Sequence, residues 1–360
     1  MFSIGVDGYE ANVPTRVGIG QYAYQVIKEL CRSANDYKLT IFLPHPPLPD
    51  MPVENKNIQY VIGKPGKLWT LTQLPHLIRM HTNLDVFFSP THYAPWFVSV
   101  PIVLSVMDLS YIRYPELFTF KDLLQLKYMG GLSIRRAKKI LTISQFSKTE
   151  IHDYYKIPLD HIEVTYPGVT ISTSKSLRNK INSRPYILFV GTIQPRKNIE
   201  RLIEAFEMID FTGDLLLVGK KGWLFEKIVK RASSSNAHDR IHFLNFVSSI
   251  ELMNMYRNAR CFVLPSLYEG FGIPVVEAMA SGVPVVVSNS SSLPEVAGNA
   301  GIVVDPSSVR DIARGIIEAL QLSNEQRKER ILNGEAQATK FTWAQCGQKT
   351  LTVLREVAQK

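Results

Sequence analysis

Two glutamates on either side of a glycine-rich loop are the residues of this sequence best suited to hold a hydroxyl-rich ligand. Glu269 and Glu277 stand eight positions apart and flank Gly270-Phe271-Gly272-Ile273-Pro274. Carboxylates are strong charge-assisted hydrogen-bond acceptors, so they suit a sugar or a ribose diol. The spacing alone fits equally well a solvated loop acid followed by an acid that complements a helix dipole. The pair by itself therefore leaves both interpretations open.

The residues after this loop predict a short helix that can receive an anion. Pro274 suits the first position of a helix, and Gly282 suits the residue just past its end. Glu277 would then fall in the first turn. Amides at a helix start lack intrahelical acceptors and favour a bound phosphate. A phosphate there would lie between the two glutamates, in a position where Glu269 can accept hydrogen bonds from a sugar and Glu277 from a ribose diol.

A second loop carries two adjacent cations. Arg196 and Lys197 belong to Gly191–Asn198 (GTIQPRKN), which follows a predicted strand at 186–190. Between a strand end and a helix start, such a pair can clamp a diphosphate and neutralise the charge that develops on a departing nucleotide diphosphate. A basic pair on a loop is more often only solvated, so position alone does not establish this role.

The glycines at 18 and 20 raise a rival interpretation. Gly18–Ala23 (GIGQYA) formally fits the dinucleotide fingerprint G-x-G-x-x-[GA]. Ten residues separate it from the preceding strand, however, and the second strand runs into Pro44-His45 instead of an acid for the ribose. An NAD-dependent oxidoreductase is therefore disfavoured. The same glycine amides can instead close on a phosphate or an acceptor.

The elements that must position these loops alternate between strand and helix. Strands are expected at 2–7, 39–43, 85–89, 101–106 and 139–143, and again at 186–190, 215–218, 241–243, 261–264, 284–288 and 300–304. This alternation predicts an α/β protein with parallel sheets, and ligands at the carboxyl ends of the strands. Two doubly wound, Rossmann-like domains would face each other across a cleft.

A polar, serine-rich and basic stretch without periodicity separates the two halves, which is typical of a linker. We expect an N-terminal domain at 1–172, a linker at 173–184, a C-terminal domain at 185–340, and a helix at 341–360 that packs back toward the first domain.

Composition narrows the class of protein. The chain has 360 residues, 45% hydrophobic and 20% charged, as expected of a soluble protein with two domains. The net charge of +9 favours anionic ligands or an anionic membrane surface, and does not show nucleic-acid binding. Three distant cysteines fit neither a disulfide framework nor a metal site. The uncharged stretch Val86–Met107 is interrupted by three prolines, so we expect buried strands there and not a membrane span.

Taken together, these strings resemble a known family. Pro265–Ser288 (PSLYEGFGIPVVEAMASGVPVVVS) resembles the EGFG-x-P-x-x-EAMA-x-G-x-PVV signature of the retaining glycosyltransferases of family 4. Gly191–Asn198 resembles their G-x-x-x-P-R-K-N segment, and Arg16–Tyr22 their R-T-G-I-G-R-Y loop. The resemblance spans nearly the whole chain and is closest to bacterial O-antigen mannosyltransferases. It implies a GT-B fold and transfer of a hexosyl group, mannose favoured, from a nucleotide diphospho-sugar to an acceptor hydroxyl in O-antigen-type glycan synthesis.

The resemblance also implies residue roles. Glu269, Arg196, Lys197 and Asp108 are the catalytic candidates, and the acceptor-side candidates are Gly20, His92 and Met107. The donor-binding residues implied in this way are Gly18, Gly191, Gly219, Val247, Gly270, Phe271, Gly272, Ile273 and Glu277. Asn245 stands where relatives often carry glycine, so it stays open whether the loop at 243–248 contacts the nucleotide base.

One segment departs from the family pattern. Many relatives place His-Asp-Leu where this chain has Met107-Asp108-Leu109, and methionine can serve neither as acid nor as base. Either the histidine is dispensable, or His92 or Asp108 replaces it, or activity is impaired. A nucleotide-sugar epimerase of the same architecture and a catalytically silent nucleotide-sugar-binding protein therefore stay as alternatives.

The expected partners follow from these features. The chain contains no D-x-D, so we expect no metal and no cofactor besides the donor, which is GDP-mannose or a UDP-sugar. The acceptor is a saccharide, free or lipid-linked. Phe120–Lys139 is basic and amphipathic, which fits a solvated helix face more often than a membrane contact. We expect a cytoplasmic protein, with peripheral contact at the inner face of the membrane as a variant.

Overall fold

The computed structural model describes residues 2–66, 68–81, 83–169, 184–245 and 247–359. The chain divides into two compact units, Met1–Gly168 with Thr342–Lys360, and Val169–Phe341. The linker expected at 173–184 lies, except for Arg184, outside the described residues.

The first unit is built on a parallel sheet with the order β3-β2-β1-β4-β5-β6-β7. Its strands are β1 Phe2–Asp7, β2 Tyr37–Leu43, β3 Ile58–Ile62, β4 Val86–Ser89, β5 Ile102–Ser105, β6 Lys139–Thr142 and β7 Ile162–Val164. The five strands predicted for this half are present, and β4 and β5 confirm that the uncharged stretch at 86–107 contains buried strands. Strands β3 and β7, at the two edges, were not predicted.

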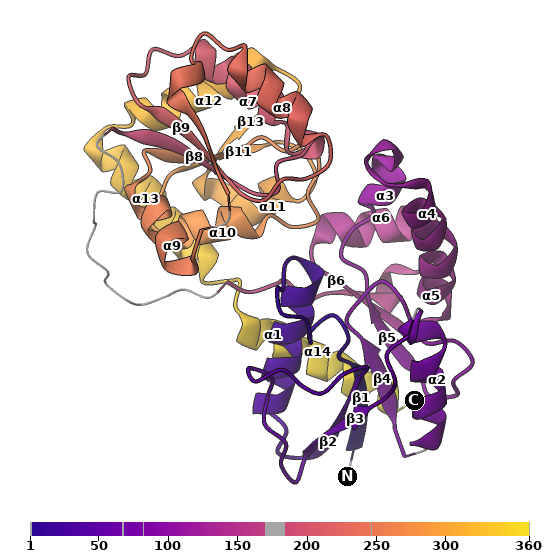
Figure 1. The fold of residues 1–360 in the computed structure, drawn as a ribbon. Helices are drawn as coiled ribbons and strands as arrows, with labels where there is room; N and C mark the ends of the chain where they lie inside the picture. The colour runs from indigo at the N-terminus through magenta and orange to yellow at the C-terminus, as the bar shows by residue number, and fades with distance from the viewer. Residues whose placement is uncertain (1, 67, 82, 170–183, 246, 360) are drawn as a thin grey trace. The chain divides into compact units, whose positions relative to one another are not determined.

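Helices cover both faces of this sheet (Figure 1). One face carries α1 (Ile19–Arg32) and α14 (Trp343–Ala358), and the other α2 (Gln73–Met80), α5 (Gly131–Arg136) and α6 (Gln145–Tyr155). The remaining helical segments are α3 Ser110–Arg113, α4 Phe120–Leu124, the π-helix η3 Gln125–Gly130, and the 3₁₀ turns η1 Trp69–Leu71, η2 Pro115–Leu117 and η4 Leu159–His161.

The C-terminal helix α14 belongs to the first unit and packs on α1. The rings of Trp343 and Tyr22 meet edge to face, 6.3 Å apart. A Cβ atom placed on Gly347 would lie 2.4 Å from Cβ of Glu29, so the two helices touch where this glycine faces α1. On α1 the residues facing inward are the apolar ones that its helical spacing predicts.

The second unit is a parallel sheet with the order β10-β9-β8-β11-β12-β13. Its strands are β8 Tyr186–Val190, β9 Asp214–Val218, β10 Ile241–Leu244, β11 Cys261–Leu264, β12 Val285–Ser288 and β13 Gly301–Val304. Helices α7 Ile199–Glu207, α8 Phe225–Ser233 and α12 Val309–Gln321 cover one face (Figure 1). The other face carries α9 Ser249–Asn258, α10 Ile273–Ala280, α11 Leu293–Ala297 and α13 Asn324–Ala338, and short 3₁₀ turns are η5 Pro195–Lys197, η6 His238–Arg240 and η7 Gly298–Ala300.

Both sheets reverse their strand order beside the first strand of the unit. In the second unit β8 lies between β9 and β11, and in the first unit β1 lies between β2 and β4. At such a point the connections leave toward opposite faces, which opens a crevice at the carboxyl ends of the strands. The predicted α/β class, with two doubly wound units, is confirmed. None of the described helices is both long enough and apolar enough to span a bilayer.

Candidate active site

The structure brings together the basic pair and the first glutamate of the motif. Arg196 and Lys197 lie in η5, after β8, and Glu269 lies in the loop after β11. Lys197 Nζ is 2.5 Å from Glu269 Oε1, and Arg196 Nη1 is 3.4 Å from Glu269 Oε2. These strands are neighbours at the point where the strand order reverses. We call these three residues the basic–acid cluster.

Glu269 and Lys197 of the cluster are buried, and Arg196 is half-buried. Glu269 is 6% exposed and Lys197 8%. Burial acts to raise the pKa of Glu269, but the charges of Lys197 and Arg196 outweigh it and lower the pKa below its ordinary value. Ser266 Oγ donates a further hydrogen bond to Glu269 Oε1 at 2.7 Å. Two cations and one carboxylate leave the cluster net positive, so it can attract an anionic leaving group.

This ion pair was not foreseen. The sequence assigned Glu269 to a sugar and the basic pair to a diphosphate, as separate contacts. In the structure both carboxylate oxygens face the cations. A phosphate that engages Lys197 must therefore share this cation with Glu269, so that the two predicted contacts become one coupled arrangement.

Backbone contacts tie the two loops of the cluster to each other. Arg196 Nη1 donates to the carbonyl of Tyr268 at 2.5 Å, and the amide of Leu267 donates to the carbonyl of Arg196 at 2.9 Å. Asn198 is buried with a φ of 60°. Its side-chain amide nitrogen, Nδ2, donates to the carbonyls of Pro265 and Pro306 at 2.9 and 2.7 Å. Asparagine tolerates this left-handed backbone, which explains the last residue of the PRKN string.

A group of serines at the end of β12 and just after it, which the sequence analysis did not single out, holds the loop of Glu269. The hydroxyl groups that bond its backbone belong to Ser288, Ser290, Ser291 and Ser292, which we call the serine clamp. Ser291 Oγ accepts from the amide of Glu269 at 2.9 Å. The buried hydroxyl of Ser292 lies 2.9 and 2.8 Å from the carbonyls of Glu269 and Phe271. The clamp therefore fixes the backbone on both sides of Glu269.

Helix α10 begins one residue earlier than predicted. Gly272 precedes the helix with a φ of 108°, and a Cβ atom there would lie 2.6 Å from Leu293, so this position requires glycine. Because Ile273 is the first helical residue, Glu277 lies in the second turn, and its predicted place in the first turn was wrong. Gly282, with a φ of 73°, follows the helix end as predicted.

The first residues after Glu269 offer backbone, not side chains. Gly270 is buried, and Phe271 is 3% exposed with its ring packed against Phe341 at a centroid distance of 5.2 Å. Gly270 and Phe271 can therefore meet a ligand only through main-chain groups. This agrees with the expectation that amides of Phe271–Ile273 contact a phosphate or sugar, although it does not test it.

Glu277 is held by a tyrosine that sequence reasoning missed. Tyr256 Oη, on α9, donates to Glu277 Oε2 at 3.0 Å. Burial raises the pKa of Glu277 to about 6, and this hydrogen bond acts in the opposite direction. The carboxylate is therefore preoriented, and it loses its charge as the pH falls through about 6. No local pattern signals Tyr256, because the two residues stand 21 positions apart.

The other donor-side candidates of the second unit lie on neighbouring loops. Gly191 and Gly219 follow β8 and β9, and a Cβ atom on Gly219 would lie 2.0 Å from the carbonyl oxygen of Gly191. These two loops therefore meet beside the basic–acid cluster. Val247 is half-buried on the loop between β10 and α9, at the edge of the sheet and further from Glu269 in strand order.

In the first unit, the glycine-rich loop starts α1. Gly18 precedes the helix with a φ of 51°. A Cβ atom on Gly20 would lie 2.9 Å from the carbonyl oxygen of Glu10, so glycine allows α1 to approach that backbone. Arg16 forms an ion pair with Asp50 through both terminal nitrogens and lies over the ring of Tyr24 at 4.0 Å. Arg16 therefore holds the loop that precedes α1 in place.

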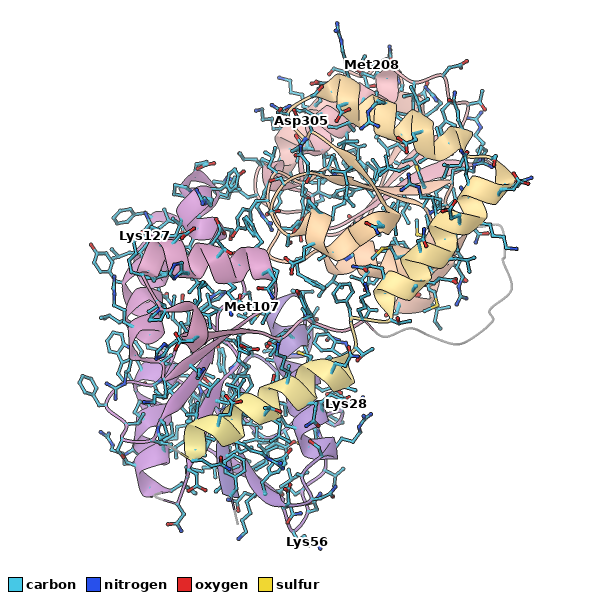
Figure 2. All side chains as sticks on the ribbon, turned by 180° about the vertical axis from the view of Figure 1, so that it is seen from behind. Lys28, Lys56, Met107, Lys127, Met208 and Asp305 are labelled. Atoms are coloured by element: carbon cyan, nitrogen blue, oxygen red, sulfur yellow. The ribbon has the colours of Figure 1, made fainter. Side chains whose placement is uncertain are left out.

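Three further candidates follow β4 and β5. Met107 is 8% exposed, and it lies inside the unit (Figure 2). Burial lowers the pKa of His92, while the charge of nearby Asp108 acts to raise it. Asp108 Oδ1 accepts the amide of Ser110 at 2.8 Å. Of these, His92 and Asp108 carry groups that can meet an acceptor hydroxyl.

Sequence analysis missed two acids near the same edge. Asp7, the last residue of β1, is 1% exposed and accepts hydrogen bonds from Trp69 Nε1 and the amide of Tyr9, both at 3.1 Å. Burial raises the pKa of Asp7 to about 6, and burial also raises the pKa of nearby Glu10. The available signal was an acid at the carboxyl end of the first strand, where the reversal of strand order places ligands.

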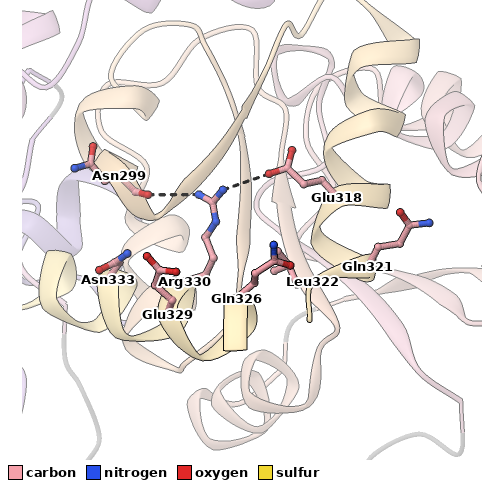
Figure 3. Close-up of a pocket in the computed structure, with 8 residues that line it drawn as sticks. All are labelled: Asn299, Glu318, Gln321, Leu322, Gln326, Glu329, Arg330 and Asn333. Carbon is pink, nitrogen blue, oxygen red and sulfur yellow. Dashed lines mark hydrogen bonds and ion pairs between the residues drawn. The ribbon is translucent and has the colours of Figure 1, made fainter. Parts of the chain in front are cut away.

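Two other features of the described residues bear on the site. No cluster of three or more histidine, cysteine, aspartate or glutamate side chains among them could hold a metal ion. A pocket between α12 and α13 is lined by none of the predicted residues (Figure 3). Arg330 lies in it, 3.3 Å from Glu318 and 3.4 Å from the carbonyl of Asn299.

Comparison with known sequences covers both units. The family described as "Glycosyltransferase Family 4" matches residues 17–173, and "Glycosyl transferases group 1" matches residues 173–337. The O-antigen chain mannosyltransferase B of Escherichia coli is 31% identical over 94% of this chain and 96% of its own length. The O-antigen chain mannosyltransferase RfbU of Salmonella typhimurium is 32% identical over 49% of each chain.

Solved structures show the same fold. Sucrose-phosphate synthase from Thermosynechococcus elongatus superimposes with a TM-score of 0.80 at 19% identity, covering 99% of both chains. WaaG, a glycosyltransferase of lipopolysaccharide biosynthesis, gives a TM-score of 0.73 at 16% identity, covering 98% of this chain and 99% of its own. Anabaena HepE in complex with UDP-glucose gives 0.75 at 18% identity, covering 99% of this chain and all of its own. With both family matches and the near full-length relative, the chain belongs to the family 4 glycosyltransferases and has their GT-B fold.

Proposed function

We propose that this enzyme transfers a mannosyl group from a nucleotide diphospho-sugar, GDP-mannose first, to a hydroxyl of a saccharide acceptor during O-antigen synthesis. The relatives named as O-antigen mannosyltransferases support the sugar and the pathway. The observation that carries the reaction type is the buried basic–acid cluster at the reversal point between β8 and β11. There a departing diphosphate meets two cations, and the sugar attached to it meets Glu269.

In this mechanism the second unit binds the donor. Arg196 and Lys197 stabilise the negative charge that grows on the diphosphate as the bond to the anomeric carbon breaks. The serine clamp presents the amides after Glu269 to the diphosphate, and Glu277 accepts hydrogen bonds from the ribose hydroxyls. The basic pair performs the charge neutralisation, so the reaction proceeds without a metal ion.

Retention of configuration follows from attack on the face that the leaving group vacates. The acceptor oxygen bonds to the anomeric carbon, the carbon–oxygen bond to phosphate breaks, and the hydroxyl proton passes to the leaving phosphate oxygen. No side chain is needed as a base in this step. The methionine at 107 is therefore compatible with turnover.

The acceptor side is assigned to the first unit. His92 and Asp108 are the candidates there, and the buried Asp7 and the half-buried Glu10 lie near the same sheet edge. We propose that the acceptor is lipid-linked and that the enzyme works in the cytoplasm, in peripheral contact with the inner face of the membrane. The excess of basic residues in the chain supports this.

A panel of nucleotide sugars tests the proposal. A donor at 100 times its Kd should stabilise the enzyme by about 2.7 kcal/mol, which thermal denaturation detects. We expect GDP-mannose to give the largest shift, and nucleotide release to require a saccharide acceptor and to persist with chelator. A UDP-sugar with the larger shift would change the assigned donor. Donor consumption without acceptor would indicate an epimerase, and binding without any turnover a silent protein.

A further inference from the structure

A row of exposed apolar side chains runs along one helical segment of the first unit. Phe120, Leu124, Tyr128 and Leu132 are 81%, 48%, 67% and 51% exposed. They are spaced four residues apart along the uninterrupted helical stretch of α4, η3 and α5. Residues at this spacing lie on one side of a helix, and the wider π turn offsets part of the drift that such spacing gives in an α-helix. We call these four residues the apolar stripe.

The stripe is not a misplaced core face, because the same segment buries a different side. Ser133 and Ile134 of α5 are fully buried or nearly so, and Leu123 and Leu126 pack against the hydrophobic core of the unit. The segment therefore has a satisfied inner face and a second apolar face directed to solvent. Contiguous exposed apolar surface of this kind marks an interaction site.

The charges around the stripe indicate what it binds. Residues 120–139 contain six basic side chains and one acidic one, Asp122. Lys121, Lys127, Arg135, Arg136 and Lys138 are exposed, and Lys127 points away from the body of the unit, opposite in the view to Lys28 and Lys56 (Figure 2). Large apolar side chains flanked by lysine and arginine are typical of helices that lie in the surface of an anionic bilayer.

A loop beside the segment adds to the same surface. Phe97 is 74% exposed and has a φ of 57°, which is uncommon for a bulky residue. The next residue accepts a hydrogen bond from Arg136, whose Nη2 lies 2.7 Å from the carbonyl of Val98. The contact holds the loop against the end of α5, so Phe97 supplies a further exposed ring close to the stripe's basic end.

The inner side of the same segment contacts the acceptor-side candidates. Ser133 Oγ accepts from the amide of Ala94 at 3.0 Å. A Cβ atom on Gly130 would lie 3.9 Å from the carbonyl oxygen of His92. One layer of helix therefore separates the stripe from the segment that carries His92. A partner that binds to the apolar stripe therefore lies next to the acceptor-side candidates of the first unit.

We propose that the apolar stripe and its flanking basic residues dock the enzyme on an anionic lipid bilayer and thereby deliver a membrane-embedded acceptor to the first unit. The side chains of the stripe enter the bilayer interface, and the lysines and arginines contact lipid phosphates. The delivery step rests on the proposed function, whereas the docking step does not require it.

Vesicle co-sedimentation of the full chain tests the docking. We expect binding to vesicles of phosphatidylcholine mixed with phosphatidylglycerol, little binding to phosphatidylcholine alone, and weaker binding as salt is raised. The variant F120S/L124S/Y128S/L132S should lose at least about tenfold in affinity, and K121E/K127E should lose binding only to the anionic vesicles. The proposal is overturned if the native chain ignores anionic vesicles or if the stripe variant binds like it.

Matched controls lie on other faces of the same unit. V53S/M80S removes two apolar side chains that are 84% and 66% exposed, and K28E/K56E reverses two exposed lysines. Both should bind vesicles like the native chain. An unchanged melting temperature of the stripe variant shows that it is folded, and gel filtration at equal concentration tests self-association. A native dimer that the stripe variant converts to monomer would assign the face to a second copy of this chain, against the proposal.

Activity separates docking from catalysis. The stripe variant should retain nucleotide-sugar binding and transfer to a soluble acceptor, and should lose about tenfold in transfer to an acceptor anchored in anionic vesicles. Equal loss with both acceptors would overturn delivery and place the stripe in the reaction machinery. If the native enzyme binds vesicles but transfers nothing, the proposed function fails while the docking surface stands.

Discussion

The two sheets bury carboxylic acids at their carboxyl edges with opposite electrostatic results. In the second unit Glu269 lies against two cations, and its pKa is lowered despite burial. In the first unit Asp7 is buried against neutral donors, and burial raises its pKa to about 6. The degree of burial is similar, so the partner decides the outcome. The basic–acid cluster of the second unit thus carries fixed charges, whereas Asp7 of the first unit titrates near pH 6.

This difference suits the two proposed tasks. Fixed cations that are already in position can stabilise a leaving diphosphate without reorganisation. The same edge of the first unit carries acids whose pKa values burial raises and a histidine whose pKa burial lowers, so it presents hydrogen-bonding groups to acceptor hydroxyls. Each prediction below changes one side of this contrast.

Removing Lys197 should have the largest effect. The K197A variant leaves Glu269 buried with one cation fewer, and breaking a buried ion pair costs about 3–5 kcal/mol of stability. Loss of a charge that stabilises the transition state should also lower kcat by about 10²–10³-fold. Thermal denaturation and steady-state kinetics measure the two effects. Full turnover by K197A would refute the clamp.

A double variant separates these two effects. In K197A/E269Q the uncompensated buried charge is absent, so most of the lost stability should return while turnover stays low. K197R keeps the charge and should fall between the native enzyme and K197A. If K197A/E269Q regained activity along with stability, Lys197 would act only by stabilising the fold.

On the opposite side of the contrast, Asp7 should make the first unit less stable at high pH. Its pKa is raised from the ordinary 3.8 to about 6, so the folded chain holds this proton where the unfolded chain has lost it. The free energy of unfolding therefore falls as pH rises through this window, by about 3 kcal/mol. The D7N variant should remove this dependence.

Calorimetry of both forms, at pH values below and above the window, checks this expectation. D7N should melt at a higher temperature than the native chain at the upper pH, and the gap should close at the lower one. The pH dependence of D7N reports all the other titrating groups, so the difference between the two proteins isolates Asp7. A native-like pH dependence in D7N would show that the pKa of Asp7 is the same in the folded and the unfolded chain.

How much of this arrangement was readable from the sequence depends on the range of each interaction. Arg196, Lys197 and Glu269 could be placed near each other, because parallel strands bring their following loops to one edge. Their ion pair could not, since side-chain distances decide whether these groups face a ligand or one another. Tyr256 and the serine clamp bond to residues more than twenty positions away, which no local pattern reveals.

The elements that were missed have weak patterns for identifiable reasons. Helix α13 buries only Gly334 and Ala338, because it packs on α10 through small side chains. Its sequence therefore shows only a weak helical periodicity of apolar residues. Strand β7 has three residues, and the edge strand β3 is mostly exposed or half-buried. The centres of both sheets, with continuous apolar runs, were predictable.

Glu277 tests whether the donor side also contains a titrating group. Burial raises its pKa to about 6, and a ribose diol requires the ionised form as acceptor. Nucleotide affinity should therefore fall about tenfold per pH unit once the pH drops below this value. Calorimetric titration across this range measures it, with E277Q as the control for titration of the ligand itself.

The hydroxyl of Tyr256 sharpens the same measurement. It acts to lower the pKa of Glu277, so Y256F should move the loss of affinity to higher pH and leave kcat at saturating donor nearly unchanged. An unshifted profile in Y256F would mean that Tyr256 only fills space. A profile identical in E277Q and the native enzyme would exclude Glu277 from the ribose.

The smallest effect is expected at Ser291, where two substitutions distinguish the role of the hydroxyl from that of the backbone conformation. This serine has a φ of 56°, and its hydroxyl accepts from the amide of Glu269. S291A loses the hydrogen bond and keeps a side chain in the left-handed region, whereas S291G loses the bond but relieves the backbone. Both should raise the donor KM about threefold, in line with one lost hydrogen bond.

Stability should distinguish the two substitutions. S291A should melt several degrees below S291G, because only alanine retains the cost of the left-handed backbone. Equal KM values with unequal melting temperatures would show that the hydroxyl positions Glu269 and the backbone angle serves only to bring that hydroxyl to its amide. A native KM in both variants would mean that the cations alone hold Glu269, and the contrast between the two sheets would then reduce to the presence of Arg196 and Lys197.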